Sequence, residues 1–319
     1  MIISNKPNLI SSDSKSAWFR VIILFILAFV GTVGMWSVVV FIPDIEKEFG
    51  LDRGTSSLLY AFTMIGFGFG TVVIGKIYDK FGIKKPILFA TFVLILCYYS
   101  YSIIPFYWQL LVLQFFMGFA ASTFFGPAMA DISNYFNKQR GFALSIVASA
   151  NYVAGATWPL LIGYFLKFID WRTTHFWISI CLFIMLPLVL CLRNVSVDET
   201  ISQTIKQRYK DIKLNLSNNQ IQVLLMLAGI CCCVAMAMPQ VHMVALCVDN
   251  GFGLQVGTEI LAVMLYSGMI SRIVFGMISD RIGPILTLLL GSFLQMLSLT
   301  LFLPFSSEIS LYVVSLMFG

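Results

Sequence analysis

One cation, Arg272, stands inside the apolar run 254–279. It lies eight residues before Asp280, about 12 Å along a helix and well inside a membrane-spanning segment. A charge at that depth is costly unless it faces water, an acid or a bound anion. Because the planar guanidinium can hold both oxygens of a carboxylate, we expect Arg272 to bind an organic anion. The alternative is that it pairs with the cytoplasmic ends of neighbouring helices.

A histidine, His242, lies inside the apolar run 220–247. An imidazole titrates near neutral pH, so His242 is a candidate carrier of a coupling proton. The alternative is a hydrogen bond from His242 to a backbone carbonyl that Pro239 leaves free. Pro239 also predicts a kink in this segment, which suits a gating helix. We expect the adjacent Gln240 to face a substrate.

Neutral polar and aromatic residues of the N-terminal part are further candidates for substrate contact. Trp36, Asn151 and Tyr152 offer hydrogen bonds or stacking surfaces within apolar runs. The alternative for Trp36 is a place at the membrane interface or facing lipid, and for Tyr152 a place in the core or at the interface. Asp131 has a different predicted role, which is to pair with Lys138, Arg140 or a basic residue of the loop at 75–85.

An octapeptide pattern, GxxxD[KR]xG, occurs twice, with its copies 201 residues apart. Each copy lies between two long apolar runs, as a polar turn between membrane-spanning helices would. Such a repeat predicts a duplicated half-molecule, and duplicated halves that meet at a central site are typical of transporters. The residues that define the two copies are Gly75, Asp79, Lys80, Gly82 and Gly276, Asp280, Arg281, Gly283.

The composition indicates an integral membrane protein. Hydrophobic residues make up 59% of the chain, charged residues only 11%, and the mean hydropathy is +0.90. A soluble domain has about 25% charged residues. Nine apolar windows are long enough to span a bilayer, and a tenth begins near Ile309. The nine lie at about 18–42, 54–75, 86–105, 108–130, 141–166, 173–192, 220–247, 254–279 and 285–304.

These windows predict an all-α, multi-pass membrane protein. We expect a cytoplasmic arm over 1–17, a six-helix half over 18–192, a polar cytoplasmic linker over 193–219 and a partial second half over 220–319. Of the 20 Lys and Arg residues, fifteen fall on the side of the N-terminus, four on the other side and one within a span. This asymmetry predicts that the N-terminus lies in the cytoplasm. We expect the chain to lie in the plasma membrane or the inner membrane of the cell. The net charge of +5 therefore reflects topology and gives no support to a nucleic-acid partner.

Several function classes are disfavoured by what the sequence lacks. The seven cysteines lie in apolar runs without CxxC spacing, and the two histidines are not clustered, so we expect no metal site and no cofactor. No GxxxxGK[ST] phosphate loop occurs, which disfavours ATP as the energy source. A membrane-embedded enzyme would need a His-Asp pair or an acidic cluster near one interface, and none is evident. An enzyme, a receptor and a lipid flippase remain alternatives.

Two segments resemble the loop signatures of the major facilitator superfamily, namely GKIYDKFGIKK at 75–85 and GMISDRIGP at 276–284. The resemblance implies two pseudo-repeated six-helix halves that work by alternating access. In that family these loops stabilise the outward-open state, so a conformational role is implied for Asp79 and Asp280. The second half would be incomplete here, because the rest of helix 10 and helices 11 and 12 of the family pattern would lie beyond Gly319. We therefore expect a C-terminally truncated chain.

A third segment, YFNKQRGFALSIVASAN at 135–151, is similar to a signature of monocarboxylate transporters and oxalate/formate antiporters. It departs from that signature at Gln139, Ser145, Ala150 and Asn151. In monocarboxylate transporters an arginine four residues before a glycine binds the substrate carboxylate, and Arg272 and Gly276 have that spacing. The family's acid one turn earlier is Gly268 here. The resemblance implies a monomeric secondary active transporter for a small organic anion, a monocarboxylate, working as a proton symporter or an antiporter in the lipid bilayer.

Overall fold

The computed structural model of the chain describes residues 14–192, 217–303 and 307–319. Helices make up almost all of this part, and it contains no β-strand. The chain divides into two compact units, Met1–Ser196 and Val197–Gly319. The linker predicted over 193–219 lies almost wholly outside the described residues, as does most of the predicted arm over 1–17.

Within the described residues, nine helical segments are long and apolar enough to cross a membrane. They coincide with the nine windows of the sequence, which confirms the predicted all-α, multi-pass fold. A shorter apolar helix follows at Glu308–Phe318, where the tenth window begins. The nine segments are Lys15–Ile42, Arg53–Phe81, Lys84–Ile103, Tyr107–Ser133, Arg140–Phe165, Trp171–Cys191, Asn219–Gln240, Val256–Ile282 and Pro284–Leu301.

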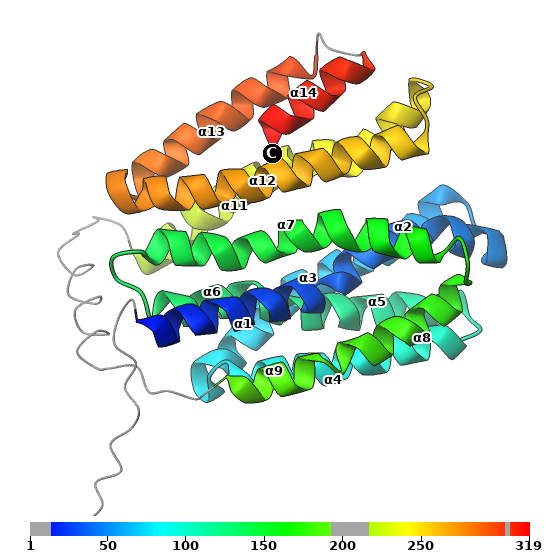
Figure 1. Cartoon of the computed structure of the whole chain (residues 1–319), viewed down its shortest axis with the longest axis horizontal. Helices are drawn as coiled ribbons and strands as arrows, with labels where there is room; N and C mark the ends of the chain where they lie inside the picture. The colour runs from blue at the N-terminus through cyan, green and yellow to red at the C-terminus, as the bar shows by residue number, and fades with distance from the viewer. Residues whose placement is uncertain (1–13, 193–216, 304–306) are drawn as a thin grey trace, which may run out of the picture. The chain divides into compact units, whose positions relative to one another are not determined.

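The N-terminal unit is a bundle of helices that run roughly along one direction (Figure 1). In this bundle α3 packs on α5, α4 on α8, and α1 on α7. Its elements are α1 (Lys15–Gly31), α2 (Val33–Phe49), α3 (Arg53–Phe81), α4 (Lys84–Ile103), α5 (Tyr107–Ala121), the 3-10 turn η1 (Ser122–Phe124), α6 (Gly126–Ser133), α7 (Arg140–Phe165), α8 (Trp171–Leu182) and α9 (Met185–Cys191).

The spans that contain α1–α2 and α5–α6 are interrupted, and their interruptions meet. The first breaks at Thr32, whose hydroxyl donates to the carbonyl oxygen of Ala28 at 2.7 Å. The other breaks at the 3-10 turn η1. A Cβ atom at Gly31 would overlap the ring of Phe124, which belongs to that turn. The two interruptions therefore fit together only because residue 31 has no side chain.

Helices α3 and α5 approach each other backbone to backbone. A Cβ atom at Gly66 would overlap the carbonyl group of Phe115, and one at Gly118 would overlap the carbonyl group of Thr63. Small residues at such contacts allow the close van der Waals packing that holds membrane helices together, since lipid provides little hydrophobic driving force between them. The glycines at positions 66 and 118 thus allow the backbones of α3 and α5 to touch.

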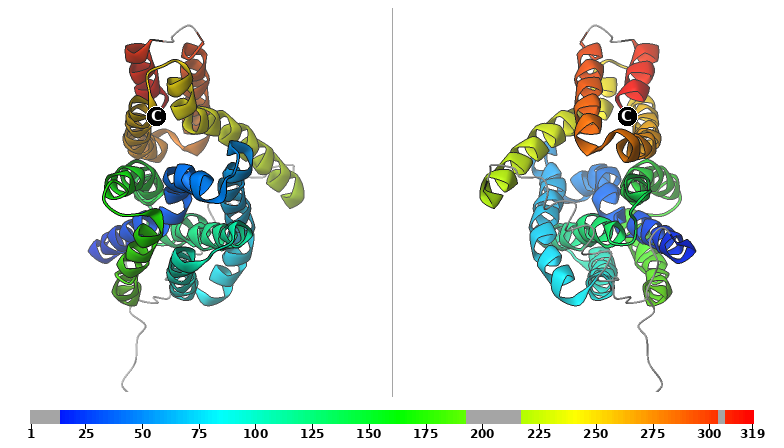
Figure 2. Two further views of the ribbon diagram at one scale, coloured as in Figure 1. Left: turned by 90° about the vertical axis from the view of Figure 1, so that its right-hand side faces the viewer. Right: turned by 90° about the vertical axis from the view of Figure 1, so that its left-hand side faces the viewer.

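The C-terminal unit contains α11 (Asn218–Asp249), α12 (Leu254–Ile282), α13 (Pro284–Leu301) and α14 (Glu308–Phe318). Helix α12 packs on α11 and on α14, and the side-by-side course of α12, α13 and α14 is visible in Figures 1 and 2. Helix α11 continues through Pro239. The buried core of the unit is formed by Met243, Cys247, Ile260, Met264 and Leu311.

Candidate functional site

The two copies of the repeated pattern end their helices in the same way. Gly82 follows α3 with φ of 72°, and its N–H donates to the carbonyl oxygen of Tyr78 at 2.8 Å. Gly283 follows α12 with φ of 89°, and its N–H donates to the carbonyl oxygen of Ser279 at 3.0 Å. A positive φ favours glycine, because other residues are strained there. The last glycine of each copy is therefore a helix stop, which explains why it recurs.

The acidic and basic residues of the pattern lie in the last turn of their helices. Asp79 on α3 and Asp280 on α12 are exposed. Lys80 and Arg281 lie next to them, where a cation interacts favourably with the negative end of the helix dipole. Exposure leaves both aspartates accessible to a partner. Their predicted role as conformational latches stays a prediction.

The first glycines of the two copies have different surroundings. A Cβ atom at Gly75 would meet no atom within 4 Å, whereas Gly276 is buried in α12. Within its own unit, Gly75 is thus not a position of close helix packing.

Two predicted residues of the C-terminal unit have described side chains. Arg272 is half-buried on α12, eight residues before Asp280, as the sequence indicated. Gln240 is half-buried on α11 beside the buried Pro239. The side chain of His242, on the same helix, lies outside the described part, so its role as a proton carrier stays a prediction.

Two predicted residues of the N-terminal unit lie in direct contact. Trp36 on α2 donates a hydrogen bond from its indole Nε1 to Asn151 Oδ1 on α7, at 3.0 Å. The indole lies against Gly155, where a Cβ atom would come within 2.6 Å of the ring. Tyr152, the next residue after Asn151, is buried. The structure thus brings Trp36 and Asn151 together on a half-buried surface and places Tyr152 in the packed interior.

Asp131 pairs with Arg20, which corrects the predicted pairing with Lys138, Arg140 or a base of the loop at 75–85. Arg20 Nε lies 2.6 Å from Asp131 Oδ2, and Arg20 Nη2 lies 3.0 Å from Asp131 Oδ1. Both side chains are buried, and the Arg20 guanidinium lies 4.8 Å from the centre of the Tyr135 ring. A buried carboxylate is stable only when nearby groups donate hydrogen bonds to its oxygens and balance its charge. Arg20 on α1 provides two such N–H donors and the balancing charge.

The sequence does contain a signal for this pair. Arg20 is the only charge within the apolar window 18–42. Arg20 lies within α1 and not in the arm before it. Burial and the negative charge of Asp131 also raise the pKa of Tyr135, which lies between two spans.

His175 lies in an aromatic cage that the sequence did not reveal. Its ring stacks on Tyr101, with ring centres 4.4 Å apart and 12° between the planes, and lies 4.1 Å from the ring of Phe41. His175 Nδ1 lies 2.7 Å from the carbonyl oxygen of Trp171. A carbonyl can only accept, so Nδ1 carries a proton. With 1% of its surface exposed, His175 has a structural role.

Gln114 extends this buried cluster across three helices. Its Nε2 donates to the hydroxyl of Tyr101 at 3.2 Å, and its Oε1 accepts from the hydroxyl of Thr63 at 2.9 Å. Both ends of the amide are therefore satisfied inside the bundle. Gln114 holds α3, α4 and α5 together.

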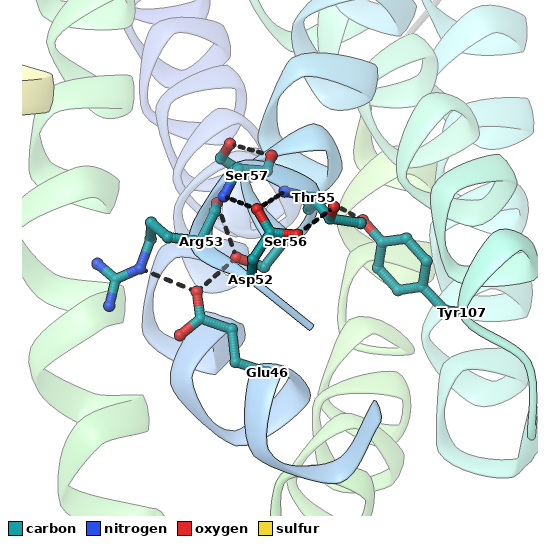
Figure 3. Close-up of polar contacts among 8 residues, drawn as sticks. Glu46, Asp52, Arg53, Thr55, Ser56, Ser57 and Tyr107 are labelled. Atoms are coloured by element: carbon teal, nitrogen blue, oxygen red, sulfur yellow. Dashed lines mark hydrogen bonds and ion pairs between the residues drawn. The ribbon is translucent and has the colours of Figure 1, made fainter. Parts of the chain in front are cut away.

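The end of the bundle opposite the repeated motif is held by acidic residues. Glu46 accepts from Arg53 Nε at 2.9 Å and from Ser56 Oγ at 2.5 Å, which joins the end of α2 to the start of α3 (Figure 3). Asp52 caps α3, and the hydroxyl and amide of Thr55 lower the pKa of its carboxyl.

Glu48 makes a second connection at this end. Trp171 Nε1 donates to Glu48 Oε2 at 2.7 Å, and Arg172 Nη2 lies 2.6 Å from Glu48 Oε1. Arg172 also donates to the carbonyl oxygen of Ile104. These bonds connect the ends of α2, α4 and α8.

No group of three or more His, Cys, Asp or Glu residues in the described ranges is placed to hold a metal ion. The polar groups that are placed to act lie instead on α12, at Arg272, and between α2 and α7, at Trp36 and Asn151. Their role in binding a solute stays a prediction.

Curated relatives match a large part of this chain. The Agnestins efflux protein AgnL12 of Paecilomyces divaricatus is 24% identical over 244 residues, which cover 75% of this chain and 54% of that protein. MFS-type transporter 1 of an Ophiocordyceps species is 23% identical over 272 residues, which cover 85% of this chain and 60% of that protein. The chain thus spans little more than half the length of these relatives.

A solved structure shares the fold. The proton:xylose symporter XylE bound to 6-bromo-6-deoxy-D-glucose aligns with a TM-score of 0.64 at 12% sequence identity, over 94% of this chain and 78% of that one. At this identity the likeness concerns the fold alone. The sequence model of the Major Facilitator Superfamily matches residues 24–319. Because that match covers most of the chain, the chain belongs to the Major Facilitator Superfamily.

Proposed function

We propose that the protein containing this chain is a secondary active transporter that moves a small organic anion, a monocarboxylate, by alternating access. The observation that carries the proposal is Arg272, a half-buried cation within the membrane span Val256–Ile282. Such a cation is tolerated where it faces water or an anion. The family and the names of the relatives support transport over a membrane-embedded enzyme.

Arg272 would hold the carboxylate through two N–H donors. Neutral contacts would come from Trp36, Asn151 and Tyr152 of the N-terminal unit and from Gln240 of the C-terminal unit. One arginine matches one carboxylate, which is why the proposal names a monocarboxylate. His242 would carry the coupling proton of a symporter. An antiporter would instead return by binding a second anion.

The two motif loops would set the conformational equilibrium. Asp79 and Asp280 are exposed at the ends of α3 and α12, so each is accessible to a basic group whose position changes between states. We place these loops and the N-terminus in the cytoplasm, with the protein acting as a monomer in the cell membrane. This orientation follows the distribution of Lys and Arg.

Export of a different organic compound is a second candidate. It is favoured by one relative, whose name describes an efflux protein and which matches 75% of this chain. The same fold serves either direction, because direction depends on the gradients and not on the architecture.

Uptake into proteoliposomes that contain the full-length transporter tests both candidates. Labelled lactate, pyruvate, formate and acetate are offered with and without a pH gradient, and protein-free liposomes give the background. The proposal predicts accumulation of at least one of these anions, accelerated by an inward proton gradient or by an internal anion. If no anion is taken up and none exchanges, the monocarboxylate proposal is wrong and export of another compound is favoured.

A further inference from the structure

The hydrogen bond between Trp36 and Asn151 fixes which way the Asn151 amide points. An indole Nε1 can only donate, so the atom of Asn151 that lies 3.0 Å away must be its oxygen. This argument removes the usual ambiguity between the two ends of an amide. The Nδ2 group, with its two N–H donors, therefore points away from Trp36.

These two donors have no acceptor in the part of the chain that the structure describes. Within that part, the Asn151 side chain makes one hydrogen bond, the one it accepts from Trp36. The Asn151 Nδ2 atom is not among the fully buried unpaired atoms of the described residues. Asn151 lies near the middle of the span Arg140–Phe165. An unsatisfied amide is strongly disfavoured in hydrocarbon. Nothing in the described part of the N-terminal unit accepts from this Nδ2 group, so its acceptor must come from outside that unit, as water or a polar solute would.

The surroundings of Trp36 hold the amide in this orientation. The indole lies against α7 because residue 155 is a glycine, where any side chain would collide with the ring. Because packing already restricts the indole, little conformational entropy is lost when its N–H donates to Asn151 Oδ1. The result is a donor group oriented before a substrate arrives.

We propose that Trp36 is a positioning residue that orients Asn151, and that Asn151 Nδ2 donates to an oxygen atom of the transported solute. This inference rests on the proposed function and adds to it a requirement on the solute. The N-terminal unit selects a solute with an oxygen acceptor, a carboxylate or carbonyl, and disfavours one that presents a donor at that position.

The first test is water access to residue 151, which does not depend on the identity of the solute. The Asn151→Cys variant of the full-length transporter is treated with a charged methanethiosulfonate reagent. Mass spectrometry of the peptide that contains residue 151 then detects the label there, so that native cysteines elsewhere do not interfere. We expect labelling at residue 151. Ala150→Cys is the matched control, because Ala150 is fully buried on the same helix and its variant should stay unlabelled.

The second test is transport kinetics. Asn151→Asp keeps an acceptor for Trp36 but replaces the N–H donors with an oxygen, so we expect KM for the anion to rise about tenfold or more. Trp36→Phe keeps a ring but loses the N–H, and we expect a smaller rise in KM with kcat little changed. Because Trp36 acts through Asn151, adding Trp36→Phe to Asn151→Leu should raise KM no further.

Trp158→Phe is the matched control for the indole. Trp158 lies on α7, the helix that carries Asn151. Its Nε1 donates to the carbonyl oxygen of Phe29 at 2.9 Å, and its ring stacks on the Phe29 ring. Its variant should leave KM unchanged. Provided that the wild type takes up the anion, either of two results would overturn this inference. One is the absence of label in Asn151→Cys, and the other is an unchanged KM in Asn151→Asp. If the wild type takes up none of the anions, the proposed function fails instead, and labelling alone then decides whether Asn151 faces water.

Discussion

Arg20 and Asp131 form a buried, two-point ion pair that joins α1 to α6 in the N-terminal unit. The two contacts measure 2.6 and 3.0 Å, and the side chains are only 6% and 7% exposed. A charge at such a site depends on its partner, because removing one partner leaves the other uncompensated. The pair therefore acts as a lock between the first and fourth membrane spans.

The lock can be tested by removing one charge. Asp131→Asn should destabilise the protein by about 3–5 kcal/mol, because Arg20 then loses its counter-charge in the interior. The double variant Arg20→Met with Asp131→Leu should recover most of that loss. Thermal unfolding in detergent measures both. Arg53→Ala is the matched control, since Arg53 is 79% exposed in its pair with Glu46 and its loss should cost about 0–1 kcal/mol. Equal losses in Asp131→Asn and Arg53→Ala would contradict the assignment.

The close approach of α3 and α5 predicts a sharp difference between two glycines of one helix. Gly66→Ala places a methyl group onto the carbonyl of Phe115, so it should cost about 1–3 kcal/mol or prevent folding. Gly68→Ala adds its methyl group where no atom lies within 4 Å, so it should be neutral or slightly stabilising. The yield of monodisperse protein and its Tm compare the two. Similar behaviour of both variants would show that the two helices do not touch at Gly66.

Asp170 predicts a pH dependence of stability. It caps α8, and hydrogen bonds from the hydroxyl and amide of Thr173 hold its pKa below the ordinary value. Because the folded-state pKa is the lower one, the stabilisation is complete above the usual titration range of aspartate and is lost as the pH falls through the folded-state pKa.

Asp170→Ala should therefore be about 1 kcal/mol less stable than the wild type at pH 7, and the difference should shrink in strong acid. Asp170→Asn keeps a capping acceptor without a titrating group, so it should lose little at pH 7. Unfolding at a series of pH values measures these differences. A gap between wild type and Asp170→Ala that stays constant down to about pH 2 would contradict the cap.

The motif aspartates predict a shift in conformational equilibrium without a loss of folding. Asp79→Asn and Asp280→Asn each remove one exposed charge at a helix end, so Tm should change little. If each aspartate holds one state of the transport cycle, the rate of uptake should fall about fivefold or more. Asp52→Asn is the control, because asparagine caps α3 as well as aspartate does. Normal uptake by both motif variants would remove the latch from the account.

The membrane spans and the helix stops were predictable from the sequence because each depends on local chemistry. Apolar windows set the spans, and Gly82 and Gly283 end their helices through backbone angles that favour glycine. The partner of Asp131 was not predictable, because Arg20 lies 111 residues away and comes near only when α1 packs on its neighbours. The same holds for the cage around His175, which draws rings from α2, α4 and α8. Contact between Trp36 and Asn151 also depends on the folded bundle, because 115 residues separate them along the chain.

The central claim is that Arg272 binds the carboxylate of the transported anion, and its most direct test is uptake of a labelled monocarboxylate by full-length variants in proteoliposomes. Arg272→Gln should lower uptake by about a hundredfold while its Tm stays near that of the wild type, because two charge-assisted hydrogen bonds are lost. Arg272→Lys, which keeps the charge without the fork, should keep part of the activity. Arg53→Gln, at the exposed pair, should transport normally. Undiminished uptake by Arg272→Gln would contradict the claim.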